Sequence, residues 1–142
     1  KEIIEAGKHI SASGIKLSVT LISGLGGKDY WEEHARESAR VINEINPDYL
    51  GLLTLLVEPG TELCDAVNEG SFKLLSPEEV ALETQLLIKN LNVQNCVFRS
   101  NHASNYFSLG GTLPYDKDKM LEQLDEIIND AENYKSEYFR GL

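Results

Sequence analysis

The sequence predicts an α/β fold, built from consecutive βα units with parallel strands. Three short apolar runs each end in a polar turn, and segments with helical spacing separate them; the runs with their turns are residues 15–23 and 24–27, 49–57 and 58–61, and 96–98 and 99–102. Such short apolar runs are typical of parallel strands buried on both faces. Because the loops after parallel strands emerge at one edge of a sheet, we expect the polar chemistry to gather at that edge.

The length, apolar content and net charge of the chain limit the kinds of protein that it can be. The chain has 142 residues, 42% of them apolar, which suits one domain with a hydrophobic core. The longest apolar run, residues 49–57, is too short to cross a membrane, so we expect no membrane partner. The net charge of −10 argues against binding to a nucleic-acid backbone. We expect a cytoplasmic protein. Because the first residue is Lys1 rather than Met and the chain starts inside a predicted helix, we also expect a piece of a longer chain.

The first predicted pair is a helix over residues 2–12 and a strand over 15–23. Ile3 and Ile10 recur on one side of this helix, and Gly14 follows it, where a left-handed residue commonly closes a helix. Apolar residues alternate from Ile15 and then become continuous, as in a strand that enters a core.

The second predicted pair is a helix from about residue 29 to residue 45 and a strand over 49–57. Asn46-Pro47 ends this helix, because the residue before a proline is biased out of the α region. The residues at helical spacing, which we expect on its buried side, are Trp31, Ala35, Ser38, Ile42 and Ile45.

The third predicted helix begins at Ser76-Pro77-Glu78-Glu79. Ser76 is expected as the N-cap, Pro77 at the first helical position, and Glu79 as the partner that completes a capping box. Its buried stripe is expected to contain Val80, Thr84, Leu87 and Leu91. Residues 93–100 contain the third strand. The connection 62–75 shows no clear element, apart from a short helical turn that is possible at 65–68.

The last predicted helix starts near Asp116. The residues expected in its buried stripe are Met120, Leu124, Ile127 or Ile128, and Ala131. We expect one α/β unit over residues 1–142, with the C-terminal helix and tail at 112–142. Crossovers of this length impose parallel strands with right-handed connections.

Three groups of residues are candidates for a site. In the turn Gly24, Leu25, Gly26 and Gly27, the glycines permit a ligand close to the backbone, or form a purely structural turn. Glu58 either is the first solvated residue after its strand or reaches into the site. Arg99, His102 and Asn105 arise together after the third strand and are candidates for binding. His9 and His34 lie on predicted helices and are expected to face solvent.

The two cysteines, Cys64 and Cys96, are expected to be free thiols. They lie far apart in a chain expected in the cytoplasm, where a disulfide is uncommon. Their spacing has no CxxC or Cys/His pattern, so they cannot form a metal site by themselves.

These segments resemble the radical S-adenosylmethionine (SAM) enzymes. Residues 13–27 resemble one strand and glycine turn of that family, and residues 46–63, with Pro59-Gly60-Thr61, resemble its next strand. Residues 99–106 resemble the end of the catalytic domain in the Fe–S oxidoreductase branch, which is related to oxygen-independent coproporphyrinogen oxidase and Elongator-type enzymes. The resemblance implies the C-terminal portion of a partial (βα)6 TIM-like barrel.

The resemblance also implies a function. A family strand with the pattern GxIxGxxE packs an apolar residue against the adenine of SAM; Ile22 and Gly24 match its centre, whereas Thr20 and Gly27 depart from its ends. The next strand contacts adenine mainly through its backbone, which points to Leu53, Thr54 and Leu55. In the intact enzyme, a reduced [4Fe–4S] cluster cleaves SAM to a 5′-deoxyadenosyl radical, which abstracts a substrate hydrogen.

The cluster-binding motif CxxxCxxC is absent from the chain, as is the GGE segment that holds the methionyl amine of SAM. We therefore expect an oxidoreductase fragment that forms the adenine side of the SAM site and is inactive alone. Arg99, His102 and Asn105 are candidates for orienting SAM or substrate.

Two other functions stay open from the sequence. One is a TIM-barrel or Rossmann-like fragment that binds nucleotide or phosphate at residues 24–27, and the other is a non-catalytic α/β interaction module. In the fragment reading, residues 15–22 form an open apolar sheet edge. We expect the chain to self-associate through this edge or to cover it with the N-terminal helix.

Overall fold

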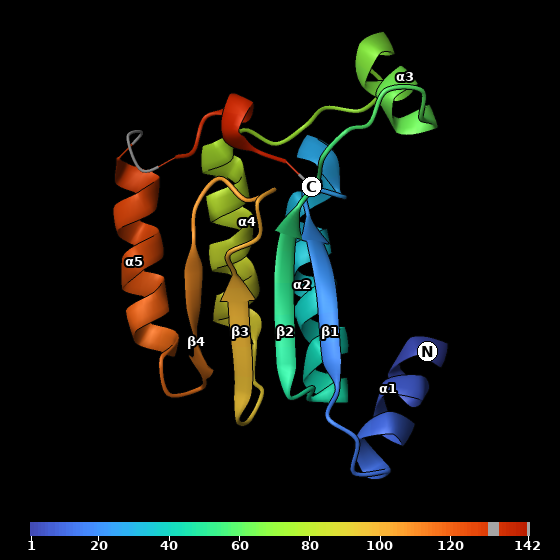
Figure 1. Ribbon diagram of the computed structural model, residues 1–142, viewed down its shortest axis with the longest axis vertical. Coiled ribbons are helices and arrows are strands. Elements are labelled where there is room, and N and C mark those ends of the chain that lie inside the picture. The colour runs from blue at the N-terminus through green and yellow to red at the C-terminus, as the bar shows by residue number, and fades with distance from the viewer. Residues whose placement is uncertain (131–133, 142) are drawn as a thin grey trace.

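A four-stranded sheet organises the protein, in the spatial order β1-β2-β3-β4 (Figure 1). The computed structural model describes residues 1–130 and 134–141. Its elements are α1 (Glu2–Ala12), β1 (Ser18–Ser23), α2 (Gly27–Ile45), β2 (Tyr49–Thr54), α3 (Glu62–Glu69), α4 (Pro77–Asn90), β3 (Cys96–Ser100), β4 (Leu109–Leu113), α5 (Lys117–Asn129) and the short 3₁₀ helix η2 (Glu137–Phe139). The predicted α/β class is confirmed.

The sheet is mostly parallel but not entirely so. β1 pairs with β2 and β2 with β3 in parallel, whereas β4 is antiparallel to β3. The expectation of parallel strands alone is therefore wrong at β4. Residues 101–108 connect β3 to β4 without a helix, and a connection this short permits only antiparallel pairing. The sheet is open rather than closed, with β1 and β4 as its edges.

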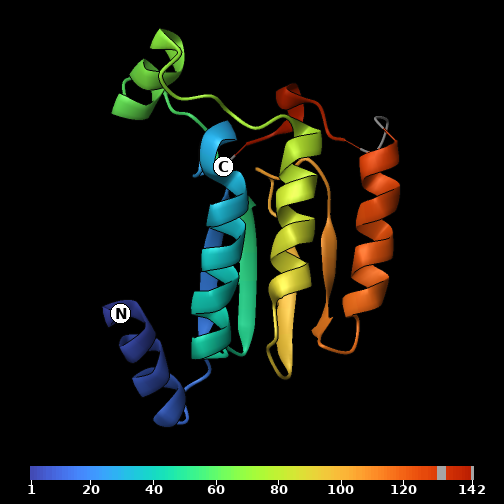
Figure 2. The ribbon, with the colours of Figure 1, turned by 180° about the vertical axis from the view of Figure 1, so that it is seen from behind.

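The helices α2, α4 and α5 all lie on one face of the sheet (Figures 1 and 2). The core lies between this face and the helices; its largest fully buried side chains are Phe98, Ile42, Leu50, Ile88, Leu113, Met120 and Leu124. Strand residues that alternate with the buried ones point to the opposite face. Among them Ser18, Thr20, Tyr49 and Arg99 are exposed, so this face is largely uncovered.

Several predicted elements are confirmed at their ends. α1 has the predicted bounds, and Gly14 after it has a φ of +80°. Ser76 and Glu79 form the predicted capping box with Pro77 at the first helical position. Asn46 ends α2, in a left-handed conformation rather than an extended one.

Other boundaries differ from the prediction. β1 begins at Ser18 rather than at residue 15, and β2 ends at Thr54 rather than at residue 57. A complete helix, α3, occupies the connection in which only a turn was expected. The boundary expected at residue 112 falls inside β4. Met120 and Leu124 are buried in α5 as predicted, and Ala131 lies outside the described residues.

The N-terminal helix packs against α2. A Cβ atom on Gly7 would come within 2.8 Å of the Ile45 side chain, so the two helices approach closely at this glycine. α1 therefore does not cover the edge of β1, where Thr20 is exposed and Ile22 is 38% exposed. No helix in the described part of the chain is long and apolar enough to cross a membrane.

Candidate functional site

A cavity lies at the carboxyl ends of β1 and β2, on the uncovered side of the sheet. Ile22 and Leu53 face each other across these strands, as partners in the parallel register. Both line a cavity of about 140 Å³; its other lining residues are Thr54, Leu55, Leu56, Glu58 and Ser104. Ile22, Leu53, Thr54, Leu55 and Glu58 were site candidates from the sequence, and the fold brings these five together.

A second cavity, of about 390 Å³, adjoins the first and shares Thr54, Leu55 and Leu56 with it. Its remaining lining comes from the end of β1, the segments after β2 and before α4, the start of α4, the loop after β3 and the C-terminal segment: Ser23, Gly24, Val57, Leu74, Leu75, Pro77, Val80, Tyr106, Glu137 and Arg140. Gly24 therefore lines a cavity, but not the one that contains Ile22.

Arg140 anchors the C-terminal segment at this edge. Its side chain is 4% exposed, and it donates hydrogen bonds to the carbonyl oxygens of Ser104 at 2.6 Å and Leu55 at 2.8 Å. The guanidinium also lies 4.0 Å from the centre of the Tyr106 ring and pairs with Glu137 at 2.6 Å. The segment thus ties the end of β2 to the loop after β3, and the sequence left its packing undecided.

Tyr106 is part of the same contact. Its hydroxyl donates to the Glu137 carboxylate and accepts a hydrogen bond from Arg140. Burial, helped by the hydrogen bond to Glu137, raises the pKa of Tyr106 to about 12, although the charge of Arg140 opposes the change. The phenol therefore stays protonated at neutral pH and acts as a structural donor.

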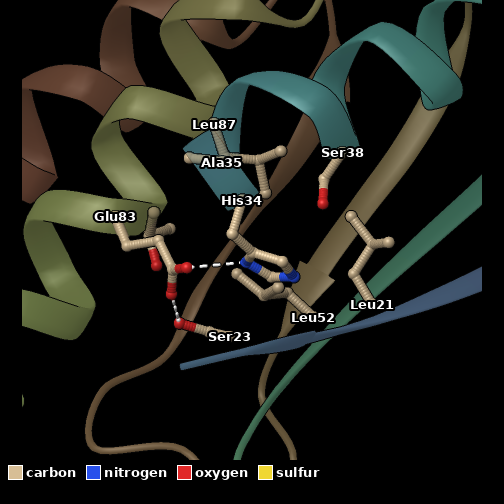
Figure 3. Close-up of a pocket in the computed structure, with 9 residues that line it drawn as sticks. Leu21, Ser23, His34, Ala35, Ser38, Leu52, Glu83 and Leu87 are labelled. Carbon is tan, nitrogen blue, oxygen red and sulfur yellow. Dashed lines mark hydrogen bonds and ion pairs between the residues drawn. The ribbon is translucent and has the colours of Figure 1, made fainter. Parts of the chain in front are cut away.

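A buried carboxylate, which the sequence analysis missed, holds the turn after β1 (Figure 3). Glu83 of α4 is 3% exposed, and it accepts hydrogen bonds from the Ser23 hydroxyl and from the backbone N–H of Gly24 at 2.8 Å. Its other oxygen lies 2.7 Å from Nδ1 of His34 in α2. His34 is half-buried, so the expectation that it faces solvent is wrong. Only the tertiary fold brings these three elements together.

Ser23, Glu83 and His34 do not form a catalytic triad. In a triad the imidazole lies between the hydroxyl and the carboxylate and takes the proton of the hydroxyl. Here the carboxylate lies between the other two, since each of its oxygens bonds one of them. The cluster therefore joins β1, α2 and α4 and does not activate a nucleophile.

The glycine turn is occupied by contacts within the protein. The N–H of Gly24 bonds to Glu83, that of Gly27 to the carbonyl of Gly24, and that of Lys28 to the carbonyl of Lys73. Gly27 has a φ of +56°, and a Cβ atom on it would lie 3.0 Å from the Lys73 carbonyl oxygen. Close packing and backbone conformation therefore explain this glycine, and the Glu83 carboxylate opposes an anion at the turn.

The three polar candidates, Arg99 near the end of β3 and His102 and Asn105 in the loop after it, do not converge. Asn105 is 3% exposed; its amide donates to the Leu52 carbonyl at 2.9 Å and to Ser100, and accepts from Thr54. The β2–β3 ladder ends with the pair Gly51 and Arg99. The Leu52 carbonyl lies beyond this pair, and the Asn105 amide supplies its hydrogen-bond donor in place of β3. A binding role for Asn105 is not supported by this geometry.

The other two candidates of this group are exposed. The Nδ1 atom of His102 accepts the N–H of Ser104 at 3.2 Å in a local turn. Arg99 lies on the uncovered face of the sheet, where it lines a different groove from the cavity of Ile22.

The cysteines are free thiols, as predicted. Cys96 is buried, and burial, with the nearby Asp48 charge, raises its pKa to about 11. Cys64 is half-buried. Among the described residues there is no group of three or more His, Cys, Asp and Glu side chains that could hold a metal ion.

No family model matches the chain, and no curated protein or solved structure is significantly similar to it.

Proposed function

We propose that this chain forms the adenine-side wall of the SAM site in a radical SAM oxidoreductase domain, as the C-terminal part of a partial (βα)6 barrel. One observation carries the proposal. Of the residues that the resemblance assigns to adenine, Ile22 in β1, Leu53 and Thr54 in β2 and Leu55 just after β2 line one cavity with Glu58. Gly24 lines the adjoining cavity.

The chemistry of this cavity suits a purine nucleoside. The aliphatic side chains of Ile22 and Leu53 offer an apolar surface to the flat face of a base. The β1–β2 ladder closes with a hydrogen bond from the N–H of Leu55 to the Ser23 carbonyl, and beyond it the backbone diverges from β1. Backbone groups past this point can bond the edge of adenine, and the Glu58 carboxylate can accept a hydrogen bond from a ribose hydroxyl.

The arrangement of the sheet also supports the proposal. Helices cover one face, as they cover the outside of a βα barrel, and the cavity lies on the other face. No strand of the described residues lies on the outer side of β1, so further parallel strands can continue the sheet from that edge. The antiparallel β4 ends it on the opposite side.

The iron–sulfur cluster does not fit this chain. A [4Fe–4S] cluster is held by cysteine thiolates, whereas Cys96 is buried with a raised pKa and Cys64 is the only other cysteine. The cluster would have to be held by residues outside this chain. The chain itself would contribute only binding and orientation of SAM. Adding iron and sulfide to the protein is expected to give no stoichiometric cluster; forming one would contradict this inference.

Ligand titration tests the adenine wall directly. Adenosine and SAM are added separately to the ¹⁵N-labelled chain, and we expect saturable shifts of the amides of Ile22 and residues 53–58. Ile22→Ser removes an apolar contact and should weaken binding about tenfold. Ile15→Ser is the matched control, because Ile15 is also exposed but lies before β1. Absence of saturable shifts, or equal weakening by the two variants, would refute the proposal.

A further inference from the structure

A polar groove lies near the β4 edge of the sheet, along β3, β4 and α5. Its volume is about 240 Å³, and its lining residues are Arg99, Asn101, Ser108, Leu109, Gly110, Lys119 and Gln123. It shares no lining residue with the cavity of Ile22 and Leu53. It is therefore a separate site, and nothing said of it depends on the proposed SAM site.

The fold explains why the groove is open beside Arg99. Phe98 and Ser100 are buried under the helices, so Arg99 between them points to the uncovered face. Its partner in the antiparallel register is Gly110, which has no side chain to fill the space above β4. On α5, Lys119 precedes the buried Met120 and lies at the flank of the helix that borders the groove.

The two cationic side chains of the groove have no partner in the described part of the chain. Arg99 and Lys119 bond through their backbones within β3 and α5, but neither side chain forms an ion pair or hydrogen bond with a residue that the structure describes. Most of the other lysine and arginine side chains form an ion pair or a hydrogen bond. The ion-paired ones are Lys8, Lys16, Lys28, Arg36, Arg40 and Arg140. Since the net charge is −10, two unpaired cations in one hollow are a local exception to the charge of the chain.

We propose that this groove binds the phosphate group of a small molecule. A phosphate monoester carries about two negative charges at neutral pH, which two cations balance. The guanidinium of Arg99 can bond two phosphate oxygens as a fork, and the ammonium of Lys119 adds a point charge. The amides of Asn101 and Gln123 and the hydroxyl of Ser108 offer neutral donors for the remaining oxygens. A carboxylate would leave one of the cations unbalanced.

The test uses the full chain with inorganic phosphate and with glycerol 3-phosphate, at constant ionic strength. We expect saturable changes of the backbone amide signals of Gly110 and Lys119, and smaller changes with acetate. Arg99→Gln and Lys119→Gln should each weaken phosphate binding about tenfold, since each removes a charged hydrogen-bond donor. Lys73→Gln is the matched control, because Lys73 is exposed and lies outside the groove. Tighter binding of glycerol 3-phosphate would identify an ester as the natural ligand, and equal binding would identify free phosphate.

Three results would overturn the inference: no saturable change at millimolar phosphate, equal weakening by Lys73→Gln, or the same response to acetate. The two groove variants change surface residues on different elements, so amide spectra can confirm that each is folded. Ile22→Ser should leave phosphate binding unchanged. The groove and the adenine wall can therefore fail independently.

Discussion

Glu83 in α4 accepts the backbone N–H of Gly24 at 2.8 Å, across 59 positions of sequence. This contact fixes the residue that follows Ile22 and Ser23, and so fixes the end of β1 at the edge of the proposed adenine wall. A buried carboxylate is tolerated here because Ser23, Gly24 and His34 all bond it. The shape of the cavity thus depends on Glu83, which does not line it.

Replacing Glu83 tests this dependence. Glu83→Ala leaves the Ser23 hydroxyl and the Gly24 N–H without an acceptor in a buried place, and should lower the free energy of unfolding by about 3 kcal/mol. Urea denaturation measures the change. Glu33→Ala, which removes an exposed glutamate of α2, should change stability by about 0.5 kcal/mol or less. Similar losses in the two variants would show that the buried contact contributes little.

Local patterns allowed the helix ends to be predicted, because the groups that decide them are neighbours in sequence. The capping box of Ser76 and Glu79 needs only its own four residues and the missing N–H of Pro77. The end of α1 likewise depends on a neighbouring residue, Gly14, which has the left-handed conformation that closes a helix. Such signals are read from sequence because no distant residue changes them.

Contacts between distant residues could not be predicted in this way. The role of Glu83 follows only from the placement of α4 against β1 and α2, which the sequence does not show. Asn105 looked like a ligand donor because the divergence of β2 from β3 is not visible in sequence. β4 was missed because Gly110 and Gly111 are poor strand formers; a Cβ on Gly111 would come within 2.7 Å of Asp116, so packing selects glycine there.

Asn105 should act on stability rather than on binding. Asn105→Asp keeps the shape of the side chain but replaces the amide that donates to Leu52 and Ser100 with a carboxylate. The free energy of unfolding should fall by about 3 kcal/mol, because a buried charge then faces a carbonyl oxygen. Asn101→Asp, at an exposed position, is the control for denaturation measurements. A stable variant with Asp at 105 would argue that this site is solvated.

The start of α4 should confer an acid-sensitive part of the stability. Burial raises the pKa of the Glu79 carboxyl, but the Ser76 N–H and the Lys28 ammonium outweigh it, so the pKa lies below its ordinary value of 4.5. The unfolded chain therefore binds this proton more readily, and the stability is present above pH 4.5 and is lost as the pH falls through the folded pKa. Glu79→Gln should flatten the dependence of stability on pH in this acidic range. A carboxyl titration of Glu79 by NMR with a midpoint at or above 4.5 would contradict the argument.

The two thiols should react very differently. The pKa of Cys96 is about 11 because the thiol is buried, whereas Cys64 is half-buried on a helix none of whose residues is buried. At pH 8 we expect iodoacetamide to modify one thiol per folded chain, since the thiolate is the reactive form. Cys64→Ser should abolish this labelling, and Cys96→Ser should leave it. Labelling of both thiols at one rate in the folded state would show that the core around Cys96 opens readily.

The free edge of β1 should pair with a second copy of the chain. The carbonyl groups of Leu17 and Ser23 accept hydrogen bonds from the N–H groups of Tyr49 and Leu55, so the backbone groups of the odd-numbered residues of β1 point toward β2. Because a strand alternates with a period of two residues, the N–H of Thr20 points away from the sheet. The opposite edge is protected at Thr112, where Asp116 accepts the N–H at 2.7 Å and donates its own N–H to the Thr112 carbonyl. β1 has no such contact at Thr20, so it is the edge that is open to strand pairing.

Thr20→Pro removes the outward N–H and should keep the chain monomeric, while the bonds to β2 are retained. Thr20→Val keeps this N–H, and should self-associate like the unchanged protein. Sedimentation equilibrium over a range of concentrations distinguishes the two, and amide spectra confirm that each variant is folded. If the unchanged chain stays monomeric at high concentration, or if Thr20→Pro associates as well, the open edge is not the contact. In the proposed parent domain, another strand would occupy the same edge and remove the tendency to associate.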